Sequence, residues 1–139
     1  MDIREYMDDD SDEVIALWAE CGLSVPHNNP GRDIERKLSV DRDLFLVGES
    51  GDEIVATVMG GYEGHRGWIN YLAVKPSFRR RGYGQVMMEA VEGRIEAKGC
   101  PKINLQIRSS NAQVIAFYRS IGYVEDHVVS LGKRLEHDN

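Results

Sequence analysis

The stretch from Trp68 to Gly84 constrains the fold of this chain most. An apolar strand, Trp68–Val74, is followed by a short link and then by residues 79–84, which read RRRGYG; apolar residues then recur at helical spacing. Glycines let the backbone approach a ligand closely, and the helix after them leaves its first N–H groups unpaired and partially positive. We therefore expect a strand, a glycine turn and a helix N-terminus that together bind a diphosphate.

The charge pattern supports a local anion site at the same place. Arg79, Arg80 and Arg81 raise the local potential in a chain whose formal net charge is −6. The alternative is a solvated loop whose glycines form a tight turn. The stretch is neither a dinucleotide fingerprint nor a P-loop, because Gly82 and Gly84 are followed by Met87 and no Gly-Lys-Ser/Thr occurs there.

Hydrophobic periodicity and turn residues predict an α+β fold with a mixed sheet. One helix is expected after a cap at residues 10–13 and before Gly22, one from Asn29, one from Gly84 to Lys98 and one over residues 111–120. The loop of residues 23–30 is either a connector or one wall of a binding site. The expected strands are Ile3–Tyr6, Leu44–Glu49, Glu53–Tyr62, Trp68–Val74, Lys102–Ile107, Tyr123–Glu125 and Val128–Leu135.

Composition excludes several classes of protein. A length of 139 residues suits one domain over residues 1–139, no apolar run approaches the roughly 20 residues of a membrane span, and the start lacks a signal peptide's apolar core. We therefore expect a cytoplasmic protein without a membrane partner. Cys21 and Cys100 have no metal-ligand spacing, so no metal is expected. A pI near 5.2 argues against nucleic acid as a partner.

Two motifs carry a resemblance to a known family. Arg79, Gly82 and Gly84, after a strand that ends in Val74, resemble the acetyl-coenzyme A signature R/Q-x-x-G-x-G/A of the GNAT superfamily of N-acetyltransferases. Residues 111–123 resemble the later GNAT motif, in which an Asn opens a helix that carries a Tyr. Residues 33–37, 58–62 and 130–135 are similar to the bacterial YpeA-type group.

The resemblance implies a GNAT-like sheet, mixed and mostly antiparallel, flanked by helices and containing a splayed parallel strand pair. It also implies acetyl-CoA as cosubstrate, with the pantetheine arm in the splay and the pyrophosphate on the glycine turn. A backbone N–H of Val74 or its neighbour would stabilise the oxyanion. The cofactor-binding residues implied are Leu72, Ala73, Val74, Arg79, Arg80, Arg81, Gly82, Tyr83, Gly84, Gln85, Asn111 and Tyr118.

The resemblance gives Tyr118 the role of the acid that protonates the departing thiolate. A phenol with a pKa near 10 is protonated at neutral pH, although an aromatic packed on a buried helix would look the same in sequence. The base stays open among Glu63, His65, Tyr71 and water. N-acetyltransferases of a ribosomal protein have a similar stretch but carry a glutamate base where this chain has Gln106.

The function predicted by this resemblance is transfer of acetyl from acetyl-CoA to a primary amine of a small molecule or peptide, by direct attack in a ternary complex. The alternative is an acetyl-CoA-binding GNAT-fold sensor or partner module with little turnover. The resemblance also allows a homodimer.

Overall fold

The computed structural model of the protein describes residues 1–24 and 28–136 and divides into two compact units. The first unit is Met1–Leu105 and the second begins at Gln106. The second unit contains α4 (Ala112–Ser120). The first unit contains, in order, β1 (Asp2–Glu5), η1 (Asp8–Asp10), α1 (Ser11–Glu20), α2 (Pro30–Leu38), η2 (Arg42–Leu44), β2 (Phe45–Ser50), β3 (Glu53–Tyr62), β4 (Gly67–Val74), η3 (Pro76–Phe78), α3 (Tyr83–Ala97) and β5 (Ile103–Leu105).

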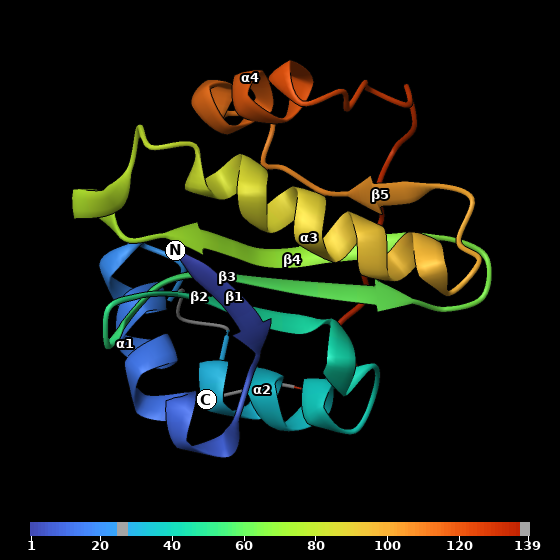
Figure 1. Cartoon of the computed structure of the whole chain (residues 1–139). Coiled ribbons are helices and arrows are strands. Elements are labelled where there is room, and N and C mark those ends of the chain that lie inside the picture. The colour runs from blue at the N-terminus through green and yellow to red at the C-terminus, as the bar shows by residue number, and fades with distance from the viewer. Residues whose placement is uncertain (25–27, 137–139) are drawn as a thin grey trace. The chain divides into compact units, whose positions relative to one another are not determined.

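The five strands form one sheet in the order β1-β2-β3-β4-β5 (Figure 1). β1 to β4 pair antiparallel with their sequence neighbours, whereas β4 and β5 are parallel, as expected for two strands connected by a helix. The mixed, mostly antiparallel sheet and its parallel pair confirm the predicted fold class. The prediction that residues 1–139 are a single domain stays a prediction.

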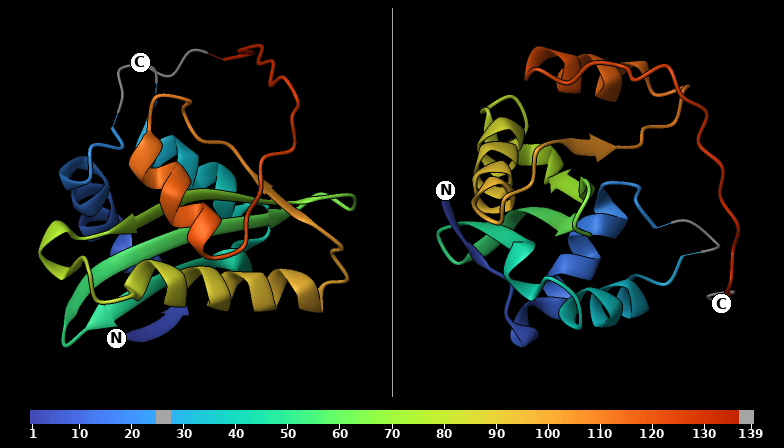
Figure 2. Two further views of the ribbon diagram at one scale, coloured as in Figure 1. Left: turned by 90° about the horizontal axis from the view of Figure 1, so that it is seen from above. Right: turned by 90° about the vertical axis from the view of Figure 1, so that its right-hand side faces the viewer.

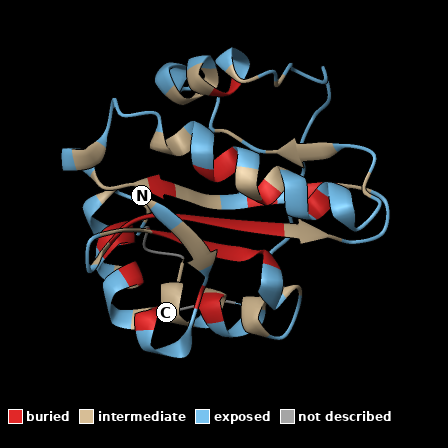
Figure 3. Ribbon diagram, in the orientation of Figure 1, coloured by how far each residue is buried: buried red, intermediate tan, exposed pale blue. Residues whose placement is uncertain are grey.

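Helices cover both faces of this sheet. Both views in Figure 2 show α3 on one face and α1 with α2 on the other. The strands between these layers are the most buried, since β2 and β3 are almost continuously buried (Figure 3). α3 packs so closely on β3 that a Cβ added at Gly60 would lie 2.6 Å from Cγ2 of Val91.

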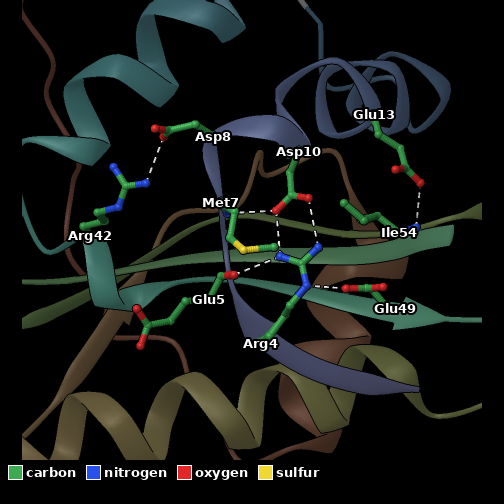
Figure 4. Close-up of polar contacts among 9 residues, drawn as sticks. All are labelled: Arg4, Glu5, Met7, Asp8, Asp10, Glu13, Arg42, Glu49 and Ile54. Atoms are coloured by element: carbon green, nitrogen blue, oxygen red, sulfur yellow. Dashed lines mark hydrogen bonds and ion pairs between the residues drawn. The ribbon is translucent and has the colours of Figure 1, made fainter. Parts of the chain in front are cut away.

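A polar network ties the start of α1 to the sheet (Figure 4). The Arg4 guanidinium donates to both carboxylate oxygens of Asp10, at 2.7 and 2.9 Å, and to Glu49. A second contact between α1 and the sheet is made by Glu13 of α1, whose carboxylate accepts the backbone N–H of Ile54 of β3 at 2.7 Å. These contacts fix the helix that carries Trp18.

The same network changes one prediction. α1 begins at Ser11, next to the expected cap, but the Asp10 side chain makes no capping hydrogen bond. Its carboxylate instead accepts the N–H of Met7 at 2.8 Å together with the Arg4 guanidinium. Asn29, in contrast, caps α2 as the sequence indicates, because its side chain accepts the N–H of Arg32 at 3.2 Å.

Several boundaries differ from the sequence prediction. β3 has the predicted bounds, but β5 is restricted to Ile103–Leu105, within the expected Lys102–Ile107. The two predicted strands Tyr123–Glu125 and Val128–Leu135 are wrong: no strand occurs there in the chain as described up to residue 136. Their alternating apolar side chains lie exposed, and without a paired neighbour a strand pattern gains neither ladder hydrogen bonds nor burial. Of the loop at 23–30, residues 25–27 lie outside the described residues.

Candidate active site

β4 extends beyond its parallel partner and leaves backbone groups at a free edge. The ladder with β5 ends at Ile69↔Leu105, whereas β4 continues to Val74. Since the N–H of Lys75 donates to the carbonyl of Val55 at 2.7 Å, strand alternation turns the N–H and C=O of Val74 away from β3. An extended ligand could pair with such an edge as an added strand does.

The carbonyl of Val74 already has two donors in the first unit. Nε of Arg79 lies 3.2 Å from it and Sγ of Cys21 lies 3.4 Å from it. Burial raises the pKa of the Cys21 thiol, which keeps this group a neutral donor. Arg79 is therefore held beside the end of β4, where the resemblance places it.

The N-terminus of α3 is capped by a glycine alone. Gly82 has φ +77° and no side-chain cap, and the first turn of α3 contains no acidic residue. The caps of α2 and α4 differ, because the side chains of Asn29 and Asn111 each accept a backbone N–H of their own helix. The first amides of α3 are therefore left to an external acceptor such as a phosphate oxygen; they belong to Tyr83, Gly84 and Gln85.

The other two arginines of the turn have different surroundings. Arg80 is exposed and takes a left-handed conformation, with φ +65°. Arg81 places its guanidinium carbon 4.8 Å from the ring centroid of Phe78, and that ring stacks with Tyr83 at 6.3 Å. The turn thus carries three arginines between β4 and α3, and the guanidinium of one of them is supported by an aromatic ring.

The predicted residues Asn111 and Tyr118 lie together in the second unit. Asn111 caps α4 by accepting the N–H of Val114 at 3.2 Å. The ring of Tyr118 makes edge contacts with Phe117 and Tyr123, at centroid distances of 5.1 and 5.6 Å. Burial raises the pKa of Tyr118 to about 12, so its phenol is protonated at neutral pH. Their participation in a site with β4 and α3 stays a prediction.

Two of the candidate bases have properties that disfavour proton abstraction. The backbone N–H groups of Arg66 and His65 hold the pKa of Glu63 below its ordinary value. Burial and a hydrogen bond to Asp33 raise the pKa of Tyr71, whose hydroxyl donates to that carboxylate at 2.6 Å. A carboxylate stabilised in its charged form and a phenol stabilised in its neutral form are both poor bases at pH 7. His65 and water are left.

Sequence reasoning missed a buried residue on β3, the strand paired with β4. Thr57 of β3 is fully buried and donates from Oγ1 to the carbonyl of Tyr71 at 2.9 Å. The one available signal was composition, because Thr57 is the only threonine in the chain.

Within residues 1–24 and 28–136, no group of three or more His, Cys, Asp or Glu side chains is arranged to hold a metal ion. Over the same residues, none of the helices has the length and apolar character needed to cross a membrane.

Solved structures with this fold include N-acetyltransferases. The structure of AAC(6')-Iy in complex with the bisubstrate analogue CoA-S-monomethyl-acetylneamine matches with a TM-score of 0.78 at 19% identity, over 96% of this chain and 97% of that one. The ribosomal-protein-S18-alanine N-acetyltransferase from Escherichia coli matches with a TM-score of 0.75 at 20% identity, over 87% of this chain and 76% of that one. At these identities the likeness shows the fold.

Sequence comparison identifies the family. Acetyltransferase SG1711 of Sodalis glossinidius is 49% identical over 139 residues, which are 99% of this chain and 98% of that protein. The acetyltransferase (GNAT) family matches residues 5–123, a range that contains the β4 edge, the glycine-capped helix and α4. The chain therefore belongs to the GNAT family of acetyltransferases.

Proposed function

We propose that this protein transfers the acetyl group of acetyl-CoA to a primary amine of a small molecule or peptide, by direct attack within a ternary complex. The observation that carries the proposal is the continuity of two binding features. The edge of β4 that extends beyond its ladder with β5 ends at Val74, and the chain then leads through the arginine turn into the glycine-capped N-terminus of α3. A linear ligand with an amide-containing arm and a diphosphate has this order of groups.

The diphosphate is assigned to the turn and the first amides of α3. Helix N-termini bind phosphate because several N–H donors converge with a favourable dipole. Gly82 allows close approach, since a side chain there would project into open space next to these amides. Arg79, Arg80 and Arg81 add positive charge in a chain of net charge −6.

The pantetheine arm is assigned to the edge of β4 at Leu72, Ala73 and Val74. Ala73 is buried and pairs with Thr57, so its side chain belongs to the core and its neighbours supply the outward backbone groups. Backbone pairing of this kind does not depend on side-chain identity. It brings the thioester end of the ligand close to Tyr71 and Leu72, where the register between β4 and β3 shifts.

The reaction needs little covalent help from the protein. The amine nitrogen forms a bond to the thioester carbon, the C–S bond breaks, the nitrogen loses a proton and the sulfur gains one. Holding the two reactants in contact supplies much of the acceleration. Tyr118, protonated at neutral pH, is the proposed donor to the sulfur, with Asn111 as helix cap and contact to the arm.

The acceptor amine determines whether a base is needed. A lysine-like amine, with a pKa of about 10.4, is mostly charged at pH 7 and must lose a proton, whereas an α-amino group with a pKa of about 7.7–8.0 is substantially neutral. Because Glu63 and Tyr71 are poor bases here, we expect an amine that is partly neutral at pH 7, or a base supplied by His65 or by water.

Calorimetric titration with acetyl-CoA followed by thiol-release assays tests the proposal. The acceptor panel contains polyamines, amino acids, aminoglycosides and short peptides. Binding with thiol release on one acceptor class supports the proposed enzyme. Binding without release on any acceptor favours a sensor module, and absence of binding overturns the assignment of the β4 edge and the arginine turn.

A further inference from the structure

β4 contains a kink just after the end of its ladder with β5. Its register with β3 changes from Met59↔Asn70 to Thr57↔Ala73, so Tyr71 and Leu72 together stand opposite a single residue, Val58. Tyr71 has φ +51°, a left-handed conformation that is unusual for an aromatic residue. Bulges of this kind redirect backbone groups and occur often beside active sites.

A buried hydrogen-bond chain holds the backbone of this kink. Oγ1 of Thr57 donates to the carbonyl oxygen of Tyr71 at 2.9 Å. The same hydroxyl accepts the indole N–H of Trp18 at 2.9 Å. Thr57 and Trp18 are both fully buried, so water does not compete for these bonds.

The side chain of Tyr71 is fixed on the same face of the sheet. Its ring stacks on Trp18 at a centroid distance of 3.9 Å with an interplanar angle of 18°. Its hydroxyl donates to Asp33 at 2.6 Å and accepts from the Asn28 amide at 3.2 Å. Contacts from α1, α2 and β3 therefore hold Tyr71 in its left-handed conformation. An unfavourable backbone conformation persists only where the surrounding structure fixes it in this way.

The direction of the Tyr71 carbonyl sets the direction of the next amide. In a trans peptide the C=O of one residue and the N–H of the following residue point in opposite directions. With the Tyr71 carbonyl drawn to Thr57, the N–H of Leu72 points away from the Thr57 hydroxyl. Leu72 has no partner residue on β3, and the ladder to β5 has already ended.

We propose that Thr57, oriented by Trp18, is a positioning residue that holds the kink of β4 and thereby aims the N–H of Leu72 at the carbonyl oxygen of the acetyl thioester. Leu72 is two residues before Val74, the position near which the resemblance implies this donor. The inference rests on the proposed function. A donor fixed before the reaction stabilises the charge that develops on this oxygen without reorganising at the moment of attack. Thr57 does not touch the substrate and acts through the peptide between Tyr71 and Leu72.

The hydroxyl of Thr57 is the part of the side chain that the role requires. Valine has nearly the same shape but can neither donate to the Tyr71 carbonyl nor accept from the indole of Trp18. Serine keeps both bonds and loses one methyl group. Thr57→Val and Thr57→Ser therefore separate the hydroxyl from the shape of the residue.

Isotope-edited infrared spectroscopy of bound acetyl-CoA, labelled with carbon-13 at the acetyl carbonyl, tests the inference without an acceptor. A hydrogen bond to the thioester carbonyl lowers its stretching frequency. We expect the frequency in Thr57→Val to shift upward from its native value, and Thr57→Ser to restore the native value. The dissociation constant of coenzyme A, which has no acetyl carbonyl, is expected to be the same in all three proteins.

Controls separate positioning from stability. Ile95→Val removes a methyl group from the core on the other face of the sheet, where Ile95 of α3 packs beside Gly60, and is expected to lower Tm while it keeps the native carbonyl frequency. If Thr57→Val does not fold, Thr57→Ala removes the same hydroxyl without pressing a methyl group on the indole N–H, and the same upward shift is expected.

The outcomes distinguish this inference from the proposed function. If the native protein does not bind acetyl-CoA, the proposed function fails and the inference falls with it. If the native protein binds acetyl-CoA and Thr57→Val keeps the native carbonyl frequency, the positioning role alone is overturned. An equal upward shift in Ile95→Val would also overturn it, because general loosening of the core would then explain the effect.

Discussion

Substitution of Gly82 by glutamate tests the proposed diphosphate site most directly. Gly82 has φ +77°, and a Cβ built there meets no other heavy atom within 4 Å. A side chain at this position therefore fits without steric conflict, and its cost is the left-handed backbone conformation. That cost is about 1–2 kcal/mol, of which about 0.4–1 kcal/mol is offset because a residue other than glycine has less freedom in the unfolded chain.

The effect of the charge is larger at the binding step. A carboxylate about 4 Å from one phosphate charge is repelled by about 1 kcal/mol in water and by about 4 kcal/mol at the effective dielectric of a protein surface. For an exposed turn facing a diphosphate we take about 2 kcal/mol, which corresponds to roughly thirtyfold weaker binding of coenzyme A. Gly82→Ala carries the same backbone strain without the charge, so its affinity is expected to fall much less.

Calorimetric titration with coenzyme A at low and high salt measures this effect. Gly93→Glu is the matched control, because Gly93 lies exposed on the same helix with open space around it. At 1.5 Å per residue it is about 16 Å further along the axis, beyond the Debye length of about 8 Å at physiological salt. The diphosphate assignment is refuted if Gly82→Glu binds as Gly82→Ala does, or if Gly93→Glu loses as much affinity as Gly82→Glu.

Three further predictions concern stability and the proposed acid. The Arg4 guanidinium lowers the pKa of Asp10, so the stability that the ionised Asp10 contributes is present above about pH 4 and is lost as pH falls through the folded-state pKa. In urea unfolding at pH 7, Asp10→Asn is expected to lower the free energy of unfolding by about 1–3 kcal/mol. The same change at the exposed Asp8 is expected to lower it by less than about 0.5 kcal/mol. Gly60→Ala places Cβ 2.6 Å from Val91, which is expected to cost about 1–3 kcal/mol and to lower Tm by several degrees in calorimetry. Tyr118→Phe is expected to lower kcat at least about a hundredfold with unchanged coenzyme A affinity, and an unchanged kcat across pH would exclude the acid role.

The parts of the fold that sequence predicted have determinants close together in the chain. The glycine turn needs only residues 79–84 and the helix after them, and α3 follows Gly82 as expected. The cap of α2 needs only Asn29 and Pro30. The bounds of β3 follow from an apolar run between two turns.

The parts that sequence did not predict depend on a neighbour that no local pattern identifies. Val129 and Leu131 alternate with other residues as in a strand, yet both are exposed and unpaired, because a strand also needs an edge to join. Asp10 lies at a cap position, but its carboxylate accepts hydrogen bonds from the guanidinium of Arg4 on β1 and does not cap α1. Tyr71 was a candidate base, but a carboxylate of α2 accepts the hydrogen bond from its hydroxyl.

The diphosphate site and the thioester site differ in how easily they can be predicted from the sequence, and Thr57 shows why. Binding of a diphosphate depends on consecutive backbone amides, so a short motif that ends in Gly82 and Gly84 records it. Orientation of a thioester depends on a peptide at Tyr71 whose support comes from distant parts of the chain. Thr57 is 14 residues from Tyr71, and Trp18 is a further 39 residues from Thr57. In the sequence, Thr57 is one more β-branched residue of a strand. A chain with valine at this position would keep every motif that places it in the family, while the kink of β4 would lose the hydrogen bond that holds it.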